Sequence, residues 1–277
     1  EETYDKDFSR RMIENKHGGQ LKLWLNLWFQ ETKVWVKKIP ILRRQVRFIL
    51  HQIKRGQIRQ LFHWLVSGHI IKWWRIQNFL NSNEQKLLQV GGGFHLKSGQ
   101  HWLNGDLIAG EIYLDATKKL PFPDNSLDIV FTEQFFEHLS QEDGLKFLSE
   151  AYRVLKVGGT LRQSTPDLEK LVALYNDKNH AVSLSEAVDR HIKNHRKNSS
   201  YARPTGCQFI NDMFRLWGHQ FIYDQETLKA ITMQAGFQQF RWVSFGESEI
   251  DSLKQLERHA DKEWMKNGFV MIYEAEK

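Results

Sequence analysis

The sequence predicts an α/β protein with a mostly parallel, doubly wound sheet, preceded by a basic helical extension. Three observations predict this organisation. From residue 87 onward, short apolar runs alternate with amphipathic helical segments, as in parallel strands joined by helices. Three glycines directly follow the first apolar run, where a cofactor crevice of such a sheet begins. The composition also changes sharply at NSNEQK, residues 81–86, which we interpret as a loop at the domain boundary.

Residues 1–84 form the predicted extension. Residues 1–86 hold 17 Lys/Arg and 7 Asp/Glu, whereas the rest of the chain holds 22 and 26. Eleven Lys/Arg and no acid lie between Glu31 and Glu84, and six of the ten tryptophans precede residue 86. Helical spacing predicts one helix from Pro40 to Gly68 and a short second helix over residues 70–80.

A basic, tryptophan-rich segment suits an anionic surface, and its partner stays open at this stage. Its amphipathic pattern favours an anionic membrane surface over nucleic acid. Packing on the following domain, or on a second copy in a homo-oligomer, explains the same pattern equally well. The single cysteine, Cys207, excludes an internal disulfide, and the uncharged stretch over residues 60–71 is too short to span a bilayer. We therefore expect a cytoplasmic protein, with membrane association as the alternative.

The second domain is expected over residues 85–277, and its elements follow in order. LLQV (87–90), SLDIVFT (126–132), TLRQST (160–165), FQQFRWVSF (237–245) and FVMIYEA (269–275) are predicted strands. Ser140 and Asp224 are predicted to cap two helices, with Gly158-Gly159 and Gly236 as their ends. A final helix is expected over residues 252–267. The gap between Asp106 and Asp115 leaves no room for a full helix, so that connection should be abbreviated.

The glycine stretch GGGFHLKSG, residues 91–99, excludes two phosphate-binding motifs. Lys97-Ser98 follows Leu96 instead of glycine, so no P-loop is present. The dinucleotide pattern G-x-G-x-x-G would likewise need glycine at position 96. A tight turn and a bed for a non-phosphate cofactor remain as alternatives.

Downstream motifs favour the cofactor. An acid precedes LPFPDNSLD, and RVLKVGG follows it. These residues resemble the class I S-adenosylmethionine (SAM)-dependent methyltransferase superfamily, which has a Rossmann-like fold. More narrowly, the chain is similar to a family of predicted SAM-dependent methyltransferases with five short elements. Here these are Gly91/Gly93, Trp102–Asp106, Glu137-His138, Leu161-Arg162 and Pro166–Leu168. The resemblance covers residues 87–275.

The resemblance implies SAM as cofactor and a set of residues that bind it. Gly91, Gly92 and Gly93 would lie under its methionine part, with Gln89 just before them. Asp106 would bind the ribose, Asp115 and Ala116 would lie near the adenine, and Thr132 and Glu133 would flank the sulfonium. Two positions depart from the superfamily pattern. Gln89 replaces an acid, and His95 stands where the third glycine of G-x-G-x-G would fall.

His138, after the fourth strand, is the candidate base for a methyl acceptor, and His219 is a second candidate. Both also have a structural interpretation, as loop-anchoring histidines. Residues 176–218 are a candidate lid over the acceptor, or a solvated insertion. No metal site is expected, since His191 and His195 have helical spacing but lack a completing ligand set.

The sequence therefore predicts a SAM-dependent methyltransferase acting on oxygen or nitrogen of a small-molecule acceptor, a saccharide or other small polar compound. A nucleic-acid methyltransferase is the first alternative, favoured only by the basic extension. The second is a non-catalytic Rossmann-like module that the basic helices anchor to a membrane or a partner.

Overall fold

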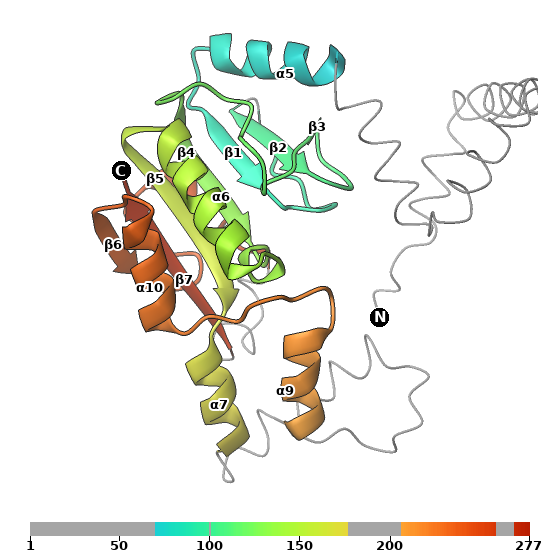
Figure 1. The fold of residues 1–277 in the computed structure, drawn as a ribbon. Coiled ribbons are helices and arrows are strands. Elements are labelled where there is room, and N and C mark those ends of the chain that lie inside the picture. Colours follow the sequence, from blue (N-terminus) through green and yellow to red (C-terminus); the bar gives the residue numbers. More distant parts are fainter. Residues whose placement is uncertain (1–69, 100, 177–205, 259–268) are drawn as a thin grey trace, which may run out of the picture. The chain divides into compact units, whose positions relative to one another are not determined.

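The computed structural model describes residues 70–99, 101–176, 206–258 and 269–277. These residues form a seven-stranded sheet with the order β3-β2-β1-β4-β5-β7-β6. Strands β1 to β5 run parallel to one another, whereas β7 is antiparallel to both of its neighbours, β5 and β6. The mostly parallel α/β fold predicted from the sequence is confirmed (Figure 1).

The strands occupy the segments where apolar runs occur in the sequence. Their bounds are Leu87–Val90 (β1), Trp102–Asp106 (β2), Ile112–Tyr113 (β3), Leu127–Glu133 (β4), Leu155–Pro166 (β5), Gln239–Trp242 (β6) and Val270–Glu276 (β7). All four residues of β1 are buried, as expected for a strand covered on both faces. The sheet therefore forms the centre of the core.

Three helices cover one face of the sheet: α5 (Ile70–Asn81), α6 (Gln141–Val154) and α10 (Gln225–Gln234). Ile76 of α5, Phe147 of α6 and Leu228 of α10 belong to one buried cluster with residues of six strands. Each of the two predicted caps is present. Ser140 accepts the amide hydrogen of Asp143, and Asp224 accepts that of Thr227.

The opposite face of the sheet is covered differently. Leu87, Trp102 and Phe131 pack there against Leu253, with Ile250 and Leu256 at the edge. These last three residues belong to an irregular segment that contains a 3-10 turn, Asp251–Leu253. Helices α7 (Leu168–Asn176) and α9 (Gly206–Arg215) contribute to a separate cluster with β7. Figure 1 shows both beyond the carboxyl end of β5.

Two sequence-based expectations about helices are wrong. The helix capped by Ser140 ends at Val154 rather than at the glycines, because Leu155 already pairs with Leu127 and Gly158-Gly159 lie within β5. Of the helix expected over residues 252–267, the described part, residues 252–258, forms no helix beyond the 3-10 turn at its start, and residues 259–267 lie outside the described residues. Long-range polar contacts determine the backbone conformation there, because Glu257 forms a buried ion pair with Arg162.

The connections in the first half of the sheet are short. Eleven residues, 91–101, join the parallel strands β1 and β2, and no helix occurs among those that the structure describes. The abbreviated connection expected after Asp106 is present, because β3 follows β2 within six residues. Loops instead of helices therefore surround the carboxyl ends of β1 and β2.

The helix expected over residues 70–80 is present as α5, and its buried Ile76 and Phe79 place it in the core of the α/β domain. The rest of the basic extension lies outside the described residues, and the boundary between residues 84 and 85 stays a prediction. Of the helices described, none combines the length and apolar character that crossing a bilayer requires.

Candidate active site

The order of the strands reverses between β1 and β4, so this doubly wound sheet has its switch point there. Ligands of such sheets bind in the crevice outside the carboxyl ends of the strands at this point. The predicted glycines follow β1, Asp106 ends β2, and Thr132 and Glu133 end β4. The fold thus brings the predicted cofactor residues to one edge of the sheet.

The three glycines have different surroundings. Gly91 has φ +73°, and a Cβ atom there would lie 2.1 Å from Cδ2 of Phe135. A Cβ atom on Gly92 would lie 2.4 Å from Nε2 of Gln89. Gly93 has φ +57°, and a Cβ atom there would meet no atom within 4 Å. Packing within the protein therefore explains the first two glycines, and only Gly93 leaves open space beside the loop.

Gln89 holds the loop that follows β1. Its Oε1 accepts the amide hydrogen of Lys97, and its Nε2 donates to the carbonyl of His95, both at 3.0 Å. Asn104, next to Gln89 in register, also accepts from the amide of Lys97 and donates to its carbonyl. A carboxylate at position 89 could not donate to His95. The departure from the superfamily acid is therefore compatible with a well-ordered loop.

Asp106 joins the loops after β1 and β2. Its Oδ2 accepts the amide hydrogen of Gly93 at 3.0 Å, and its Oδ1 accepts those of Ile108 and Ala109. A carboxylate offers about four acceptor positions, so Oδ2 retains one that a ribose hydroxyl could fill. With the open space at Gly93, this residue fits the cofactor implied by the resemblance.

The next predicted cofactor residues follow β3. Asp115 is half-buried, and its Oδ1 accepts both the amide and the hydroxyl hydrogen of Thr117. Ala116 beside it is buried in the core. One carboxylate oxygen thus shapes the turn, and Oδ2 has no hydrogen-bond partner among the residues that the structure describes. This geometry is compatible with an amino-group ligand at Asp115, a role that stays a prediction.

The residues that end β4 differ from the prediction in their surroundings. Thr132 is fully buried, and its hydroxyl has no partner among the described residues. Glu133 is also buried, and it accepts from both the amide and Nε of Arg258 at 2.8 and 3.0 Å. Burial raises the pKa of Glu133, whereas Arg258 opposes this shift. No sequence pattern indicates this role of Arg258, which lies 125 residues from Glu133.

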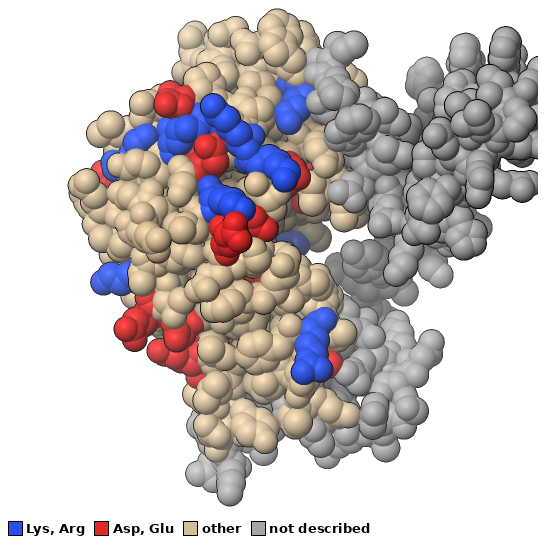
Figure 2. Space-filling model, in the orientation of Figure 1, with Lys and Arg blue, Asp and Glu red and all other residues tan. Residues whose placement is uncertain are grey.

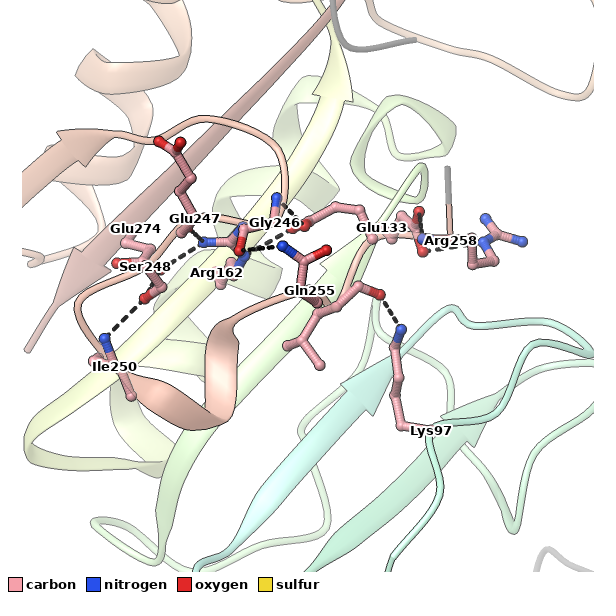
Figure 3. A network of polar contacts seen from close by, with 12 residues as sticks. Lys97, Glu133, Arg162, Gly246, Glu247, Ser248, Ile250, Gln255, Arg258 and Glu274 are labelled. Carbon is pink, nitrogen blue, oxygen red and sulfur yellow. Dashed lines mark hydrogen bonds and ion pairs between the residues drawn. The ribbon is translucent and has the colours of Figure 1, made fainter. Parts of the chain in front are cut away.

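Glu133 belongs to a larger polar network, which Figure 3 shows from close by. Lys97 donates to the carbonyl of Leu256, and Arg162 pairs with Glu257 at 2.8 Å and Glu274 at 2.6 Å. These last three side chains are at most 1% exposed. The network therefore fixes the segment around residues 246–258 to the face of the sheet that carries Gln89 and Glu133.

A second cluster lies where the chain leaves the edge of β4. Glu137 and His138 belong to a 3-10 turn, Phe136–His138, and His219 lies in the loop between α9 and α10. Ligand atoms of the three side chains all lie within 4.8 Å of one another. The two imidazole rings meet edge to face with their centroids 4.8 Å apart. The two histidines predicted separately from the sequence are thus neighbours.

This cluster combines one fully buried carboxyl group with two half-buried imidazole rings. Glu137 is fully buried, and burial raises the pKa of its carboxyl to about 8. Oε2 accepts the hydroxyl hydrogen of Thr165 at 3.1 Å, and Oε1 has no partner among the described residues. Burial also lowers the pKa values of His138 and His219, so their neutral forms are favoured.

Hydrogen bonding distinguishes the two nitrogens of His219. Its Nδ1 lies 2.5 Å from the carbonyl oxygen of Met213. Because a carbonyl can only accept, Nδ1 must carry the hydrogen, and the neutral ring then presents a lone pair at Nε2. Sequence reasoning identified His219 but could not supply this orientation.

A separate cavity of about 510 Å³ lies by the end of β6 and the beginning of β7. The residues that line it include four polar ones, Lys170, Gln225, Ser244 and Glu247, and two aromatic ones, Trp242 and Phe245. The buried Asp167, which follows β5, lies within 3.7 Å of Lys170 and 3.4 Å of Gln225. The cavity therefore lies at the same edge of the sheet as the cluster.

Figure 2 shows one face of the molecule, on which Lys and Arg are interspersed with Asp and Glu. Neither sign of charge dominates the described part of this face. On α6, Lys146 pairs with Glu142 and Asp143, and Arg153 pairs with Glu150 and Asp124. Most of the candidate lid, residues 176–218, and both His191 and His195 lie outside the described residues.

Comparisons with known proteins agree with this geometry. Residues 100–162 match the sequence model of a methyltransferase domain. The ubiquinone/menaquinone biosynthesis C-methyltransferase UbiE of Vibrio cholerae is 31% identical over 149 residues, which cover 52% of this chain and 51% of that protein. A probable SAM-dependent methyltransferase of Mycolicibacterium smegmatis is 47% identical over 49 residues, 18% of each protein. The chain spans about half or less of the curated relatives it matches.

One of the similar solved structures is a SAM-dependent methyltransferase from Archaeoglobus fulgidus. It has 17% sequence identity and a TM-score of 0.41, covering 78% of this chain and 94% of that one.

Proposed function

Because the chain carries a class I SAM-dependent methyltransferase domain, for which SAM is the cofactor, we propose that it transfers a methyl group to oxygen or nitrogen of a small polar acceptor. The observation that carries this proposal is the crevice at the β1/β4 switch point. There Gly93 leaves open space beside Asp106, whose Oδ2 retains an acceptor position. In this assignment Asp106 binds the ribose, Asp115 and Ala116 flank the adenine, and Glu133 flanks the sulfonium.

SAM supplies an electrophilic methyl group and leaves as S-adenosylhomocysteine. The acceptor atom must lose a proton when it forms the new bond to carbon. We propose His138 and His219 as the catalytic residues that assist this loss. Support comes from their common position after β4 and from the lone pair on Nε2 of His219.

A saccharide or similar polyol is the acceptor class that the nearby cavity supports. Its lining residues combine polar types with the aromatic residues Trp242 and Phe245, a combination suited to a ligand with hydroxyl groups and apolar ring faces. The names of the UbiE relatives specify carbon as acceptor in those proteins. Products methylated at carbon would therefore contradict the choice of oxygen or nitrogen.

Isothermal titration calorimetry of the full chain with SAM, S-adenosylhomocysteine and NAD tests the cofactor assignment. We expect both adenosyl compounds to bind and NAD not to bind. Asp106→Asn, which leaves one side-chain oxygen for the turn after β2, should weaken the binding of both adenosyl compounds. A folded chain that binds neither of them would contradict the proposal. Binding without turnover of any saccharide or amine would instead favour the anchored, non-catalytic module.

A further inference from the structure

We propose that Glu137, His138 and His219 bind one divalent transition-metal cation of the Zn²⁺ type. The acceptor oxygen or nitrogen would then occupy an open position on this cation. Only this second statement rests on the proposed function, because the binding of the cation is argued from the geometry of the three side chains.

The ligand atoms of the three side chains are near enough to one another for a single cation to recruit all three after small movements. All three atoms lie within 4.8 Å of one another. Zinc binds nitrogen and oxygen at about 2.0–2.2 Å, so ligand atoms of a tetrahedral site lie ~3.4 Å apart. Small rotations of the two partly exposed imidazole rings would bring the atoms together.

The donor set selects the class of cation. Two imidazoles and one carboxylate form the ligand set of catalytic zinc sites, in which a fourth position stays open for water or substrate. Mg²⁺ and Ca²⁺ prefer oxygen ligands throughout, and two nitrogen donors disfavour both. A cation at this site would lower the pKa of a bound hydroxyl group, whose proton would pass to solvent. The two histidines would then assist the loss of this proton as ligands of the cation instead of accepting it themselves.

Outer hydrogen bonds orient two of the three ligands. Nδ1 of His219 donates to the carbonyl of Met213, which leaves the lone pair of Nε2 for the metal. Thr165 donates to Oε2 of Glu137, and Oε1 of this fully buried carboxyl has no partner among the described residues. A buried carboxyl oxygen without a hydrogen bond is unfavourable, and a cation would satisfy it.

The backbone also joins the two segments that supply the ligands. The amides of Gln220 and Phe221 both donate to the carbonyl of Glu137, at 2.7 and 3.2 Å. The side chain of Gln220 donates to the carbonyl of His138 at 2.6 Å. His219 is thereby held beside the 3-10 turn before any ligand binds, so the site is largely preformed.

Metal content and affinity test the proposal directly. The full chain would be stripped with EDTA, dialysed, and titrated with Zn²⁺ in a calorimeter, with MgCl₂ as the contrasting cation. We expect one Zn²⁺ per chain, measurable also by mass spectrometry of the metal, and visible d–d bands when Co²⁺ replaces it. A folded wild-type chain that binds no Zn²⁺ would overturn the proposal.

Substitutions locate the site. Glu137→Gln and His219→Asn should each weaken Zn²⁺ binding at least tenfold, and Thr165→Val should do so by about tenfold through the lost outer contact. His101→Asn removes a histidine outside the cluster and should bind as the wild type does. Unchanged affinity in folded Glu137→Gln and His219→Asn would place the cation elsewhere and overturn the assignment. If those two variants do not fold, Thr165→Val and the Co²⁺ spectrum decide.

The same samples separate this proposal from the proposed function. SAM binding by the stripped chain, with no Zn²⁺ binding, would refute the metal site and leave the methyltransferase assignment intact. Zn²⁺ binding without SAM binding would support the metal site and contradict the methyltransferase assignment.

Discussion

The loops around Asp106 and the side chains around Arg162 are held together in different ways. Asp106 and Gln89 bond to backbone groups at most 13 residues away in the sequence. Arg162 bonds to Glu257 and Glu274, which lie 95 and 112 residues away. The first region is partly exposed and leaves space for a ligand, whereas the second is fully buried and closed.

Because of this difference, substitutions in the two regions should have different effects on stability and on ligand binding. Short-range hydrogen bonds shape a loop without fixing distant parts of the chain, so a change there should lower stability less and should also affect ligand binding. Long-range buried ion pairs fix the segment over residues 246–258 to the sheet, so a change there should affect stability first.

Removal of Arg162 should have the largest effect. Arg162→Met leaves two buried carboxylates without their common partner, and we expect the free energy of unfolding to fall by about 3–5 kcal/mol. Urea denaturation followed by circular dichroism measures it. Arg241→Met is the matched control, because Arg241 also pairs with Glu274 but has a side chain that is 40% exposed. It should cost about 1 kcal/mol or less. Equal losses would contradict the contrast between buried and exposed pairs.

Gln89→Glu tests the short-range region. The change keeps the acceptor for Lys97 but removes the donor to His95 and buries a carboxylate, so we expect a loss of about 1–3 kcal/mol in the free energy of unfolding. Gln238→Glu, on an exposed residue, should change stability by less than ~0.5 kcal/mol. A Gln89→Glu variant as stable as the wild type would show that the amide donor does not hold the loop.

The smallest effect concerns pH. The hydrogen bond from Arg153 lowers the pKa of Glu150 in the folded chain. A lowered pKa contributes stability above the unfolded value of about 4.3 and loses it as the pH falls through the folded value. Glu150→Gln should therefore be ~1 kcal/mol less stable than the wild type at neutral pH, and the difference should vanish in acid. Thermal unfolding at pH 7 and pH 3 measures this, and a constant difference would contradict it.

The parts of the site that could be predicted from the sequence are the local ones. The caps Ser140 and Asp224 each act on a backbone amide three residues away, so spacing alone indicates them. Gly91–Gly93 and Asp106 are indicated by short motifs and by the family that these motifs resemble. The buried strands could also be predicted, because each apolar run is a local feature of the sequence. The structure confirms the two caps and places the glycines after β1 and Asp106 at the end of β2, whereas their roles in binding SAM stay predictions.

The remaining parts depend on contacts between distant segments. Glu257 and Arg258 lie within a stretch whose spacing predicts a helix. In the structure Arg258 instead bonds to Glu133, and Glu257 pairs with Arg162, so both residues are held against the sheet. The cluster of Glu137, His138 and His219 needs two loops 82 residues apart, as the bond from Gln220 to His138 shows. Local spacing could not predict that these three side chains lie together, because the cluster depends on this long-range contact.

The most direct test of the cofactor crevice is the affinity of S-adenosylhomocysteine for Gly93→Ala and Gly158→Ala, measured by calorimetry. Both glycines have positive φ, +57° and +78°, and both leave space for a Cβ atom, so each change costs a similar ~1–2 kcal/mol in backbone strain. Only Gly93 lies beside Asp106. We predict at least tenfold weaker binding for Gly93→Ala and unchanged binding for Gly158→Ala. Equal affinities in the two variants would contradict a cofactor seated at the β1/β4 switch point.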